Sequence, residues 1–501
     1  MGLRKPKIDK ELQEFRDIMA VPSTFHEGFN WISLIGTIFI ALLMVPGAIY
    51  MGLLAGVGIG PATQWVTVIL FIEVAKRAHK HLNRSEIFVL FFMAGAMITG
   101  MGFTSMRGAG LLWQQFFARS DAAHAYGIAE HLPTWVAPPP NSESYAHRSF
   151  LHPDWFPVIG LMIFGTFFGQ IQNMILGYGL FRVASDVEKL PFPMAPVGAQ
   201  GIIALAEEEE EKNAKREEDS WRWRVFSIGG AMGLAFGTIY LLLPILTGAL
   251  TGNPIQIFPI PFSDFTVNTQ SFLPAVATGI VWDFGSLIMG MVLPFFGMLG
   301  SFIGLITTFI LNPVLYKFGI LDSWTPGDDT VVTLFKNNVD FYFSFQIGIA
   351  LAIAVVGIYN VIRSLHKVRL ERGKNHDALH RDLAPEGRGD IPTWLIVVSY
   401  LFITLTYITV SGFLIHWHRG VMAVLFFLGF VYTPLISYVT ARLEGMVGQV
   451  VAIPFIREAS MILSGYKGVA CWFLPIPMAN YGRMTVFYRQ CELTGTKFTS
   501  I

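Results

Sequence analysis

Ten long apolar stretches constrain this chain more than any other feature of its sequence. Each has about 18 residues or more and few charges, which is close to the length that a helix needs to cross a bilayer. They are residues 31–57, 62–78, 87–104, 156–182, 225–250, 269–289, 292–314, 341–362, 394–415 and 421–441. Only 14% of all residues are charged, whereas soluble domains carry about 25%. We therefore expect an all-α polytopic membrane protein with about ten transmembrane helices.

The Lys and Arg residues between these stretches predict an orientation. The N-terminal arm 1–28 is basic, and so is the segment 76–84, two crossings later. The loop 105–154 has only three Lys or Arg, the loop 251–268 has none, and the segment 363–390 has seven. Because cytoplasmic loops are enriched in Lys and Arg, the N-terminus is predicted to be cytosolic and the loop 105–154 extracytoplasmic.

This alternation divides the chain into six expected parts. They are a cytosolic arm (1–28), membrane helices 1–4 (29–182), a Pro-rich re-entrant or cytosolic element with an acidic run (183–224), membrane helices 5–8 (225–362), a basic cytosolic connector (363–390), and membrane helices 9–10 followed by broken apolar segments (391–501). The broken segments are expected to be re-entrant or to lie along the membrane interface.

Pro- and Gly-broken apolar segments are candidates for substrate contacts. Irregular backbone at membrane depth is tolerated where it is buried in protein or lines a cavity, and transporters build their sites from such pieces. The segment 186–211 contributes Pro193, Gly198 and Gln200 as candidate substrate-binding residues. The alternative is a cytoplasmic loop with one amphipathic helix.

Two intact spans add further candidate substrate-binding residues. The first span is rich in glycine around Tyr50, Gly52 and Gly56, which favours local unwinding or, as the alternative, close helix packing. The fourth span contains three amides, of which Gln170 and Asn173 share one face. They are predicted to bind peptide-like polar groups or to join helices.

Two carboxylates are candidates for proton coupling. An ionisable group inside a span is costly and is by default a functional hypothesis. Asp283 lies near the middle of the stretch 269–289, and its alternative role is to cap a broken helix. Glu73 lies about one turn from Lys76 and Arg77, so its alternative role is that of an interfacial carboxylate.

Four charged residues flank the break between Gly445 and Pro454. They are Arg442, Glu444, Arg457 and Glu458. They form a candidate charged gate, and the alternative is a set of exposed interfacial pairs.

Several function classes lack support in the sequence. There is no P-loop and no HExxH or GxSxG motif, so we expect no enzymatic activity. Two cysteines and scattered loop histidines match no metal motif, so no metal and no cofactor are expected. The net charge of zero gives no indication of a nucleic-acid partner. The expected partners are a small-molecule substrate and membrane lipid.

Several pieces, in this order, resemble the oligopeptide transporter (OPT) superfamily, in its prokaryotic branch related to yellow-stripe-like carriers. They are AIYMGLLAGVGIGPA (48–62), EKLPFPMAPVGAQGIIAL (188–205), WRVFSIGGAMGLAFGTIYLLLPILTG (223–248), PIQIFPIPFSDFT (254–266), RLEGMVGQVVAIPFIREASMILSGYKG (442–468) and ELTGTKFTSI (492–501). The resemblance implies a proton-coupled symporter in a bacterial or archaeal cytoplasmic membrane. It would import oligopeptides, peptide-like solutes or metal chelates by alternating access.

The chain departs from the family pattern in two places. Met194 stands where the family's LPFP motif is usually followed by Gly, and the family's ELTGTKFTS-like stretch is followed by further helices. We therefore expect a partial or C-terminally shortened chain, or a fold completed by a homo-oligomer or a partner chain. The alternative function is a non-transporting membrane scaffold subunit of a larger complex.

Overall fold

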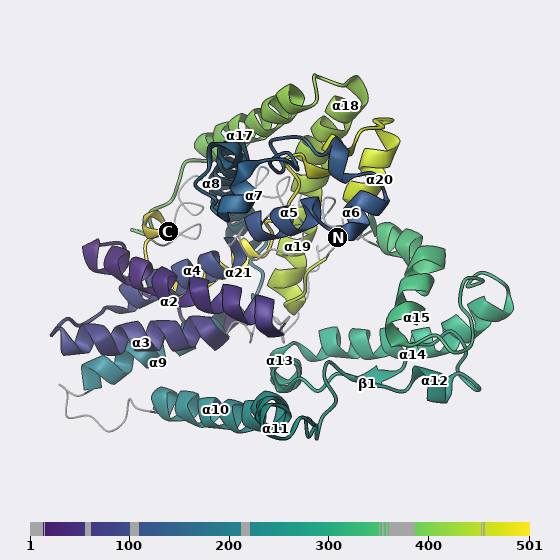
Figure 1. The fold of residues 1–501 in the computed structure, drawn as a ribbon. Coiled ribbons are helices and arrows are strands. Elements are labelled where there is room, and N and C mark those ends of the chain that lie inside the picture. The colour runs from purple at the N-terminus through teal and green to yellow at the C-terminus, as the bar shows by residue number, and fades with distance from the viewer. Residues whose placement is uncertain are drawn as a thin grey trace, which may run out of the picture. The chain divides into compact units, whose positions relative to one another are not determined.

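The computed structural model describes residues 14, 16–55, 62–100, 110–211, 221–349, 351, 352, 355, 356, 359, 385, 387–451, 453 and 456–501. The chain divides into two compact units. The first unit contains Met1–Ile18, Pro191–Asn360 and Met446–Pro454, and the second contains Met19–Leu190, Val361–Gly445 and Phe455–Ile501. Figure 1 shows both units as assemblies of helices.

The protein is an all-α polytopic membrane protein. Within the described residues, five helical segments are long and apolar enough to cross a bilayer: Pro153–Val187, Trp221–Thr251, Phe295–Lys317, Thr393–Leu414 and Arg419–Val447. Two shorter apolar helical segments are Trp31–Gly47 and Ala195–Ala206. The regular structure thus follows the apolar pattern of the sequence.

One expected span is not a continuous helix, and the prediction for 269–289 is wrong in this respect. The region contains α12 (Thr266–Thr269), the strand β2 (Gly279–Ile280) and α13 (Phe284–Val292). β2 pairs antiparallel with β1 (Ser263–Asp264). Pro274 cannot continue a helix through this region, and the carbonyl of the next residue, Ala275, accepts hydrogen bonds from Asn312 and Asn337 instead.

The rest of the first unit is also helical. Its elements are α9 (Ala195–Glu211), α10 (Trp221–Gly237), η4 (Thr238–Leu242), α11 (Leu243–Thr251), α14 (Phe295–Lys317), α15 (Thr330–Asn337) and η5 (Asn338–Tyr342). The π-helical turn η4 joins α10 to α11 just before Pro244. A proline ring disturbs the hydrogen bonds of the preceding turn, which explains the wider turn at this point.

The second unit begins with a group of three helices. These are α2 (Trp31–Ala55), α3 (Ala62–Arg77) and α4 (Arg84–Gly100), which pack against one another. A small surface region follows, with α5 (Leu111–Ala118), α6 (Asp121–Ala125), η1 (Ala129–His131), α7 (Glu143–His147) and η2 (Pro153–Trp155).

Long helices form the centre of the second unit. α8 (Phe156–Phe181) continues into the π-helical turn η3 (Arg182–Val187) and packs against α17 (Thr393–Leu414) and α21 (Met484–Leu493). α18 (Arg419–Phe427), η6 (Leu428–Tyr432) and α19 (Thr433–Val447) form one helical segment. It is followed by α20 (Ile456–Leu463), η7 (Val469–Phe473) and, after α21, η8 (Phe498–Ser500). α8 and α17 lie side by side in Figure 1.

The apolar but irregular segment 474–482 is held by hydroxyl groups of these helices. Ser411 of α17 donates to the carbonyl of Pro475 at 2.6 Å, and Thr433 of α19 donates to the carbonyl of Pro477 at 2.9 Å. The backbone N–H of Tyr481 in turn donates to Ser437. A backbone without helical hydrogen bonds needs such partners inside a membrane. We call these three contacts the hydroxyl ladder.

Candidate functional site

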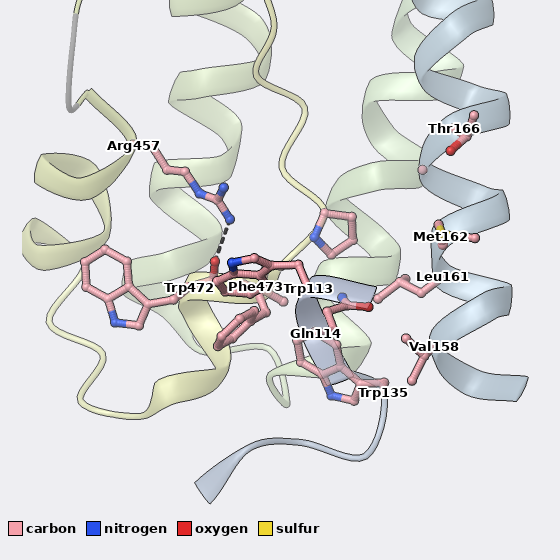
Figure 2. Close-up of a pocket in the computed structure, with 13 residues that line it drawn as sticks. Trp113, Gln114, Trp135, Val158, Leu161, Met162, Thr166, Arg457, Trp472 and Phe473 are labelled. Carbon is pink, nitrogen blue, oxygen red and sulfur yellow. Dashed lines mark hydrogen bonds between the residues drawn. The ribbon is translucent and has the colours of Figure 1, made fainter. Parts of the chain in front are cut away.

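A pocket of about 440 Å³ lies within the second unit. It is lined by Trp113, Gln114, Trp135, Val158, Leu161, Met162, Gly165, Thr166, Arg457, Trp472, Phe473, Leu474 and Pro475 (Figure 2). Its size falls in the range of about 300–1,000 Å³ that small-molecule sites occupy. Mostly apolar walls with a few polar groups are also typical of such sites.

Aromatic side chains form much of the wall. Trp113 of α5 stacks on Phe117 with ring centroids 4.7 Å apart, and Phe117 contacts Phe473 at 5.9 Å. Trp135 comes from the loop that follows η1 and packs against the cluster of buried residues around Ile408 and Leu425. These rings pack against one another or against the hydrophobic core, so neighbouring side chains hold the aromatic wall in place.

The opposite wall is the N-terminal half of α8. Val158 is buried in a cluster with Leu111 and Trp155, which fixes the start of the helix. The carbonyl of Gly165 accepts a hydrogen bond of 2.8 Å from the hydroxyl of Tyr407 on α17. Figure 2 shows Leu161, Met162 and Thr166 along this helix.

Arg457 of α20 is the cation of the pocket. Its Nη2 donates to the backbone carbonyl of Trp472 at 2.6 Å (Figure 2). In the part of the chain that the structure describes, no carboxylate forms an ion pair with Arg457, and its Nε has no hydrogen-bond acceptor. Burial lowers the pKa of Arg457, while the neighbouring Glu458 raises it. Since arginine stays protonated in proteins, the pocket holds a positive charge.

The segment that carries Trp472 and Phe473 is positioned by the hydroxyl ladder. Ser411 fixes the carbonyl of Pro475, two residues beyond η7. The buried thiol of Cys471 donates to the carbonyl of Gly468 at 3.4 Å, at the start of η7. The irregular segment is therefore a defined part of the pocket wall.

The amides predicted on α8 occupy different environments. Gln172 is fully buried: its Nε2 donates to the hydroxyl of Thr404 at 2.9 Å, and its Oε1 accepts from the hydroxyl of Tyr481 at 3.0 Å. Gln170 is half-buried, and Asn173 contacts the sulfur of Met484 at 4.0 Å. Gln172 thus joins three elements, whereas the predicted substrate-binding residues were Gln170 and Asn173.

The other predicted substrate-binding residues belong to other parts of the chain. Tyr50 and Gly52 lie in α2, and Gly56 lies outside the described residues. Pro193 is buried in the first unit, where Gly198 and Gln200 are half-buried on α9. Their role in substrate binding stays a prediction.

The two predicted proton-coupling carboxylates have local partners. Asp283 is the N-cap of α13, where its Oδ1 accepts from the N–H of Gly285 at 2.9 Å and its Oδ2 from the hydroxyl of Ser286 at 2.6 Å. Glu73 on α3 is 56% exposed and lies 4.0 Å from both Lys76 and Arg77. Both arrangements match the structural alternatives of the sequence analysis, and proton coupling by either residue remains a prediction.

Two of the four predicted gate residues form ion pairs with residues outside the gate. Arg442 forms an ion pair of 2.8 Å with Glu188, which also accepts from Tyr438. Glu444 lies 3.8 Å from Arg483. Arg457 lines the pocket, and Glu458 is exposed on α20. Gating by these residues is likewise still a prediction.

A buried ionic core at the other end of α8 was not foreseen. Arg388 contacts Glu492 at 2.6 Å, Asp186 at 2.8 Å and Asp390 at 3.0 Å. Arg182 also pairs with Asp186, and Arg489 pairs with Glu492, each at 2.5 Å. We call these six residues the ionic core. Twenty residues of helix separate Met162 from Arg182, so the pocket and the ionic core are about 30 Å apart along α8.

The charge of Arg388 is strongly stabilised although its side chain is only 1% exposed. Burial by itself would lower its pKa, but the hydrogen bonds and charge of Asp186, with Glu492 and Asp390, outweigh burial and raise the pKa. The rings of Phe181 and Phe498 also lie 5.5 and 5.0 Å from the guanidinium carbon. No local sequence pattern marks this set, because Asp186 is 202 residues away from Arg388.

Comparison with known protein families identifies a match. The family model described as OPT oligopeptide transporter protein matches residues 142–480. This range contains α8, α17 and α20, and most of the pocket residues. No curated protein and no solved structure matches the chain.

Proposed function

Because the chain belongs to the OPT oligopeptide transporter family, we propose that it is a secondary active transporter that imports oligopeptide-type solutes together with protons. The family match over residues 142–480 is the observation that carries this proposal. The pocket adds support, since its volume of about 440 Å³ suits a solute of a few residues.

The proposed mechanism is alternating access. In the predicted topology the loop 105–154 is extracytoplasmic, and this loop supplies Trp113, Gln114 and Trp135 to the pocket. The pocket would therefore face the side from which an importer takes up its solute. The ionic core, at the far end of α8, would lie toward the cytosol.

Uptake by proteoliposomes tests the proposal. Purified protein would be reconstituted, and entry of a radiolabelled tripeptide measured with the outside more acidic than the inside, without a gradient, and with a protonophore. We expect accumulation only with the gradient. A ferric chelate serves as the second probe, because the resemblance to the family also implies metal chelates as solutes. If neither probe enters and other chains co-purify in fixed stoichiometry, the scaffold alternative replaces the transporter.

Asp283 provides the test of proton coupling. Asp283→Asn keeps an N-cap but removes the titrating group, so the variant should lose most of the stimulation of uptake by the pH gradient. Asp329→Asn is the matched control, because Asp329 caps α15 by accepting from Val332. Equal uptake by the two variants and the unmodified protein would restrict Asp283 to capping.

A further inference from the structure

The pocket contains hydrogen-bonding atoms that the described protein leaves without partners. The Nη2 of Arg457 donates to the carbonyl of Trp472, but its buried Nε has no acceptor among the described residues, and no carboxylate of those residues forms an ion pair with it. The side-chain Oε1 of Gln114 is buried and accepts no hydrogen bond from any residue that the structure describes. A buried polar group without a partner is unfavourable, so a native pocket that holds two such side chains is expected to receive a ligand that supplies complementary groups.

The chemistry of the walls defines this ligand. A guanidinium group pairs best with a carboxylate, because its N–H groups match the two carboxylate oxygens. An amide oxygen accepts from an N–H group. The rings of Trp113, Trp135 and Phe473 offer an apolar surface beside both groups. A terminal residue of a peptide combines a carboxylate, a backbone N–H and a side chain.

We propose that this pocket binds the C-terminal residue of an apolar oligopeptide. Arg457 pairs with the terminal carboxylate, Gln114 accepts a hydrogen bond from the peptide backbone, and the aromatic wall contacts the terminal side chain. This inference rests on the proposed function and adds to it a specificity, namely a free carboxylate in the solute and an identified residue that recognises it.

The first experiment changes the ligand and leaves the protein intact. The full chain in lipid nanodiscs is titrated by calorimetry with the tripeptide Leu-Leu-Phe and, separately, with the same peptide carrying a C-terminal amide. Charge-assisted hydrogen bonds make the free acid bind about tenfold more tightly or better. Equal affinities, or no binding of either peptide, would overturn the proposal.

The second experiment changes the protein. Arg457→Gln should reduce the preference for the free acid to about threefold or less, whereas Arg457→Lys, which keeps the charge, should retain a larger preference. Arg148→Gln is the control, because Arg148 is an exposed arginine outside the pocket. If Arg457→Gln keeps the full preference for the acid, the carboxylate does not bind at Arg457.

The proposed transport function and the proposed recognition of a carboxylate in the pocket can be contradicted independently of each other. Uptake of the acid and the amide at the same rate would leave a transporter without carboxylate recognition. Binding that discriminates between the peptides, in the absence of uptake, would leave the pocket assignment intact and remove the transport function.

Discussion

Arg388 connects three segments that are distant in the sequence. It contacts Asp186 in η3, Asp390 in its own segment, and Glu492 on α21. A buried ion pair adds little net stability compared with well-packed apolar residues, but removal of one partner leaves an uncompensated buried charge. The consequence of a substitution here therefore depends on which charges remain.

We expect Arg388→Met to destabilise the protein by about 3–5 kcal/mol, because Asp186 and Glu492 lose their shared cation. Thermal unfolding in detergent measures the loss, with Arg148→Met as the exposed control. Equal stability of the two variants would contradict this account of the ionic core.

At the scale of elements, the segment 474–482 and the π-helical turn η6 share one feature: backbone carbonyls that accept hydrogen bonds from side chains of the long helices. The hydroxyl ladder supplies partners to backbone groups that have no helical hydrogen bonds. The π-helical turn η6 has a similar partner, since the carbonyl of Gly429 accepts from the hydroxyl of Tyr400 at 2.5 Å. Side chains of α17 thus stabilise both irregular pieces.

Removal of a ladder hydroxyl should loosen this segment. Thr433→Val leaves the buried carbonyl of Pro477 without its donor and should cost about 1–3 kcal/mol. Thr406→Val is the matched control, since the hydroxyl of Thr406 bonds only within its own helix, to Phe402. Thermal unfolding and hydrogen exchange around Tyr481 would report the difference, and equal behaviour of the two variants would argue against the ladder.

At the scale of the molecule, residues near the two ends of the chain lie together in the second unit. His26 and Thr496 form a parallel bridge, the N–H of Gly28 donates to Ser500 at 3.0 Å, and Lys497 pairs with Glu27 at 3.2 Å. We therefore expect both segments to lie on the same side of the membrane, so that the chain between them would cross the bilayer an even number of times.

Cysteine labelling tests this topology. Single variants Glu27→Cys and Lys497→Cys should react with a membrane-impermeant maleimide from the same side of oriented vesicles, the cytosolic side in the predicted orientation. Arg148→Cys, in the loop 105–154, should react from the other side. The native Cys471 and Cys491 are buried and should give little background. Labelling of positions 27 and 497 from opposite sides would contradict the pairing of the two segments.

The sequence by itself determined the fold class and most of the helix positions. Long apolar stretches are a local property, since the bilayer requires each helix to be apolar over about 20 residues. The same reasoning failed at 269–289, where a mostly apolar stretch with one charged residue, Asp283, was predicted to form one helix. There, Asn312 and Asn337 stabilise an irregular backbone from distant helices, and no hydropathy pattern can reveal such partners.

Only the tertiary structure decided which polar residues act together. The sequence identified three amides on α8, but the contacts of Thr404 and Tyr481 distinguish Gln172 from its neighbours. Similarly, the structure places Arg457, a predicted gate residue, in the wall of an aromatic pocket that the sequence did not predict. The physical reason is distance along the chain: hydrophobicity is set residue by residue, whereas a hydrogen bond or ion pair depends on a partner that folding brings from hundreds of residues away.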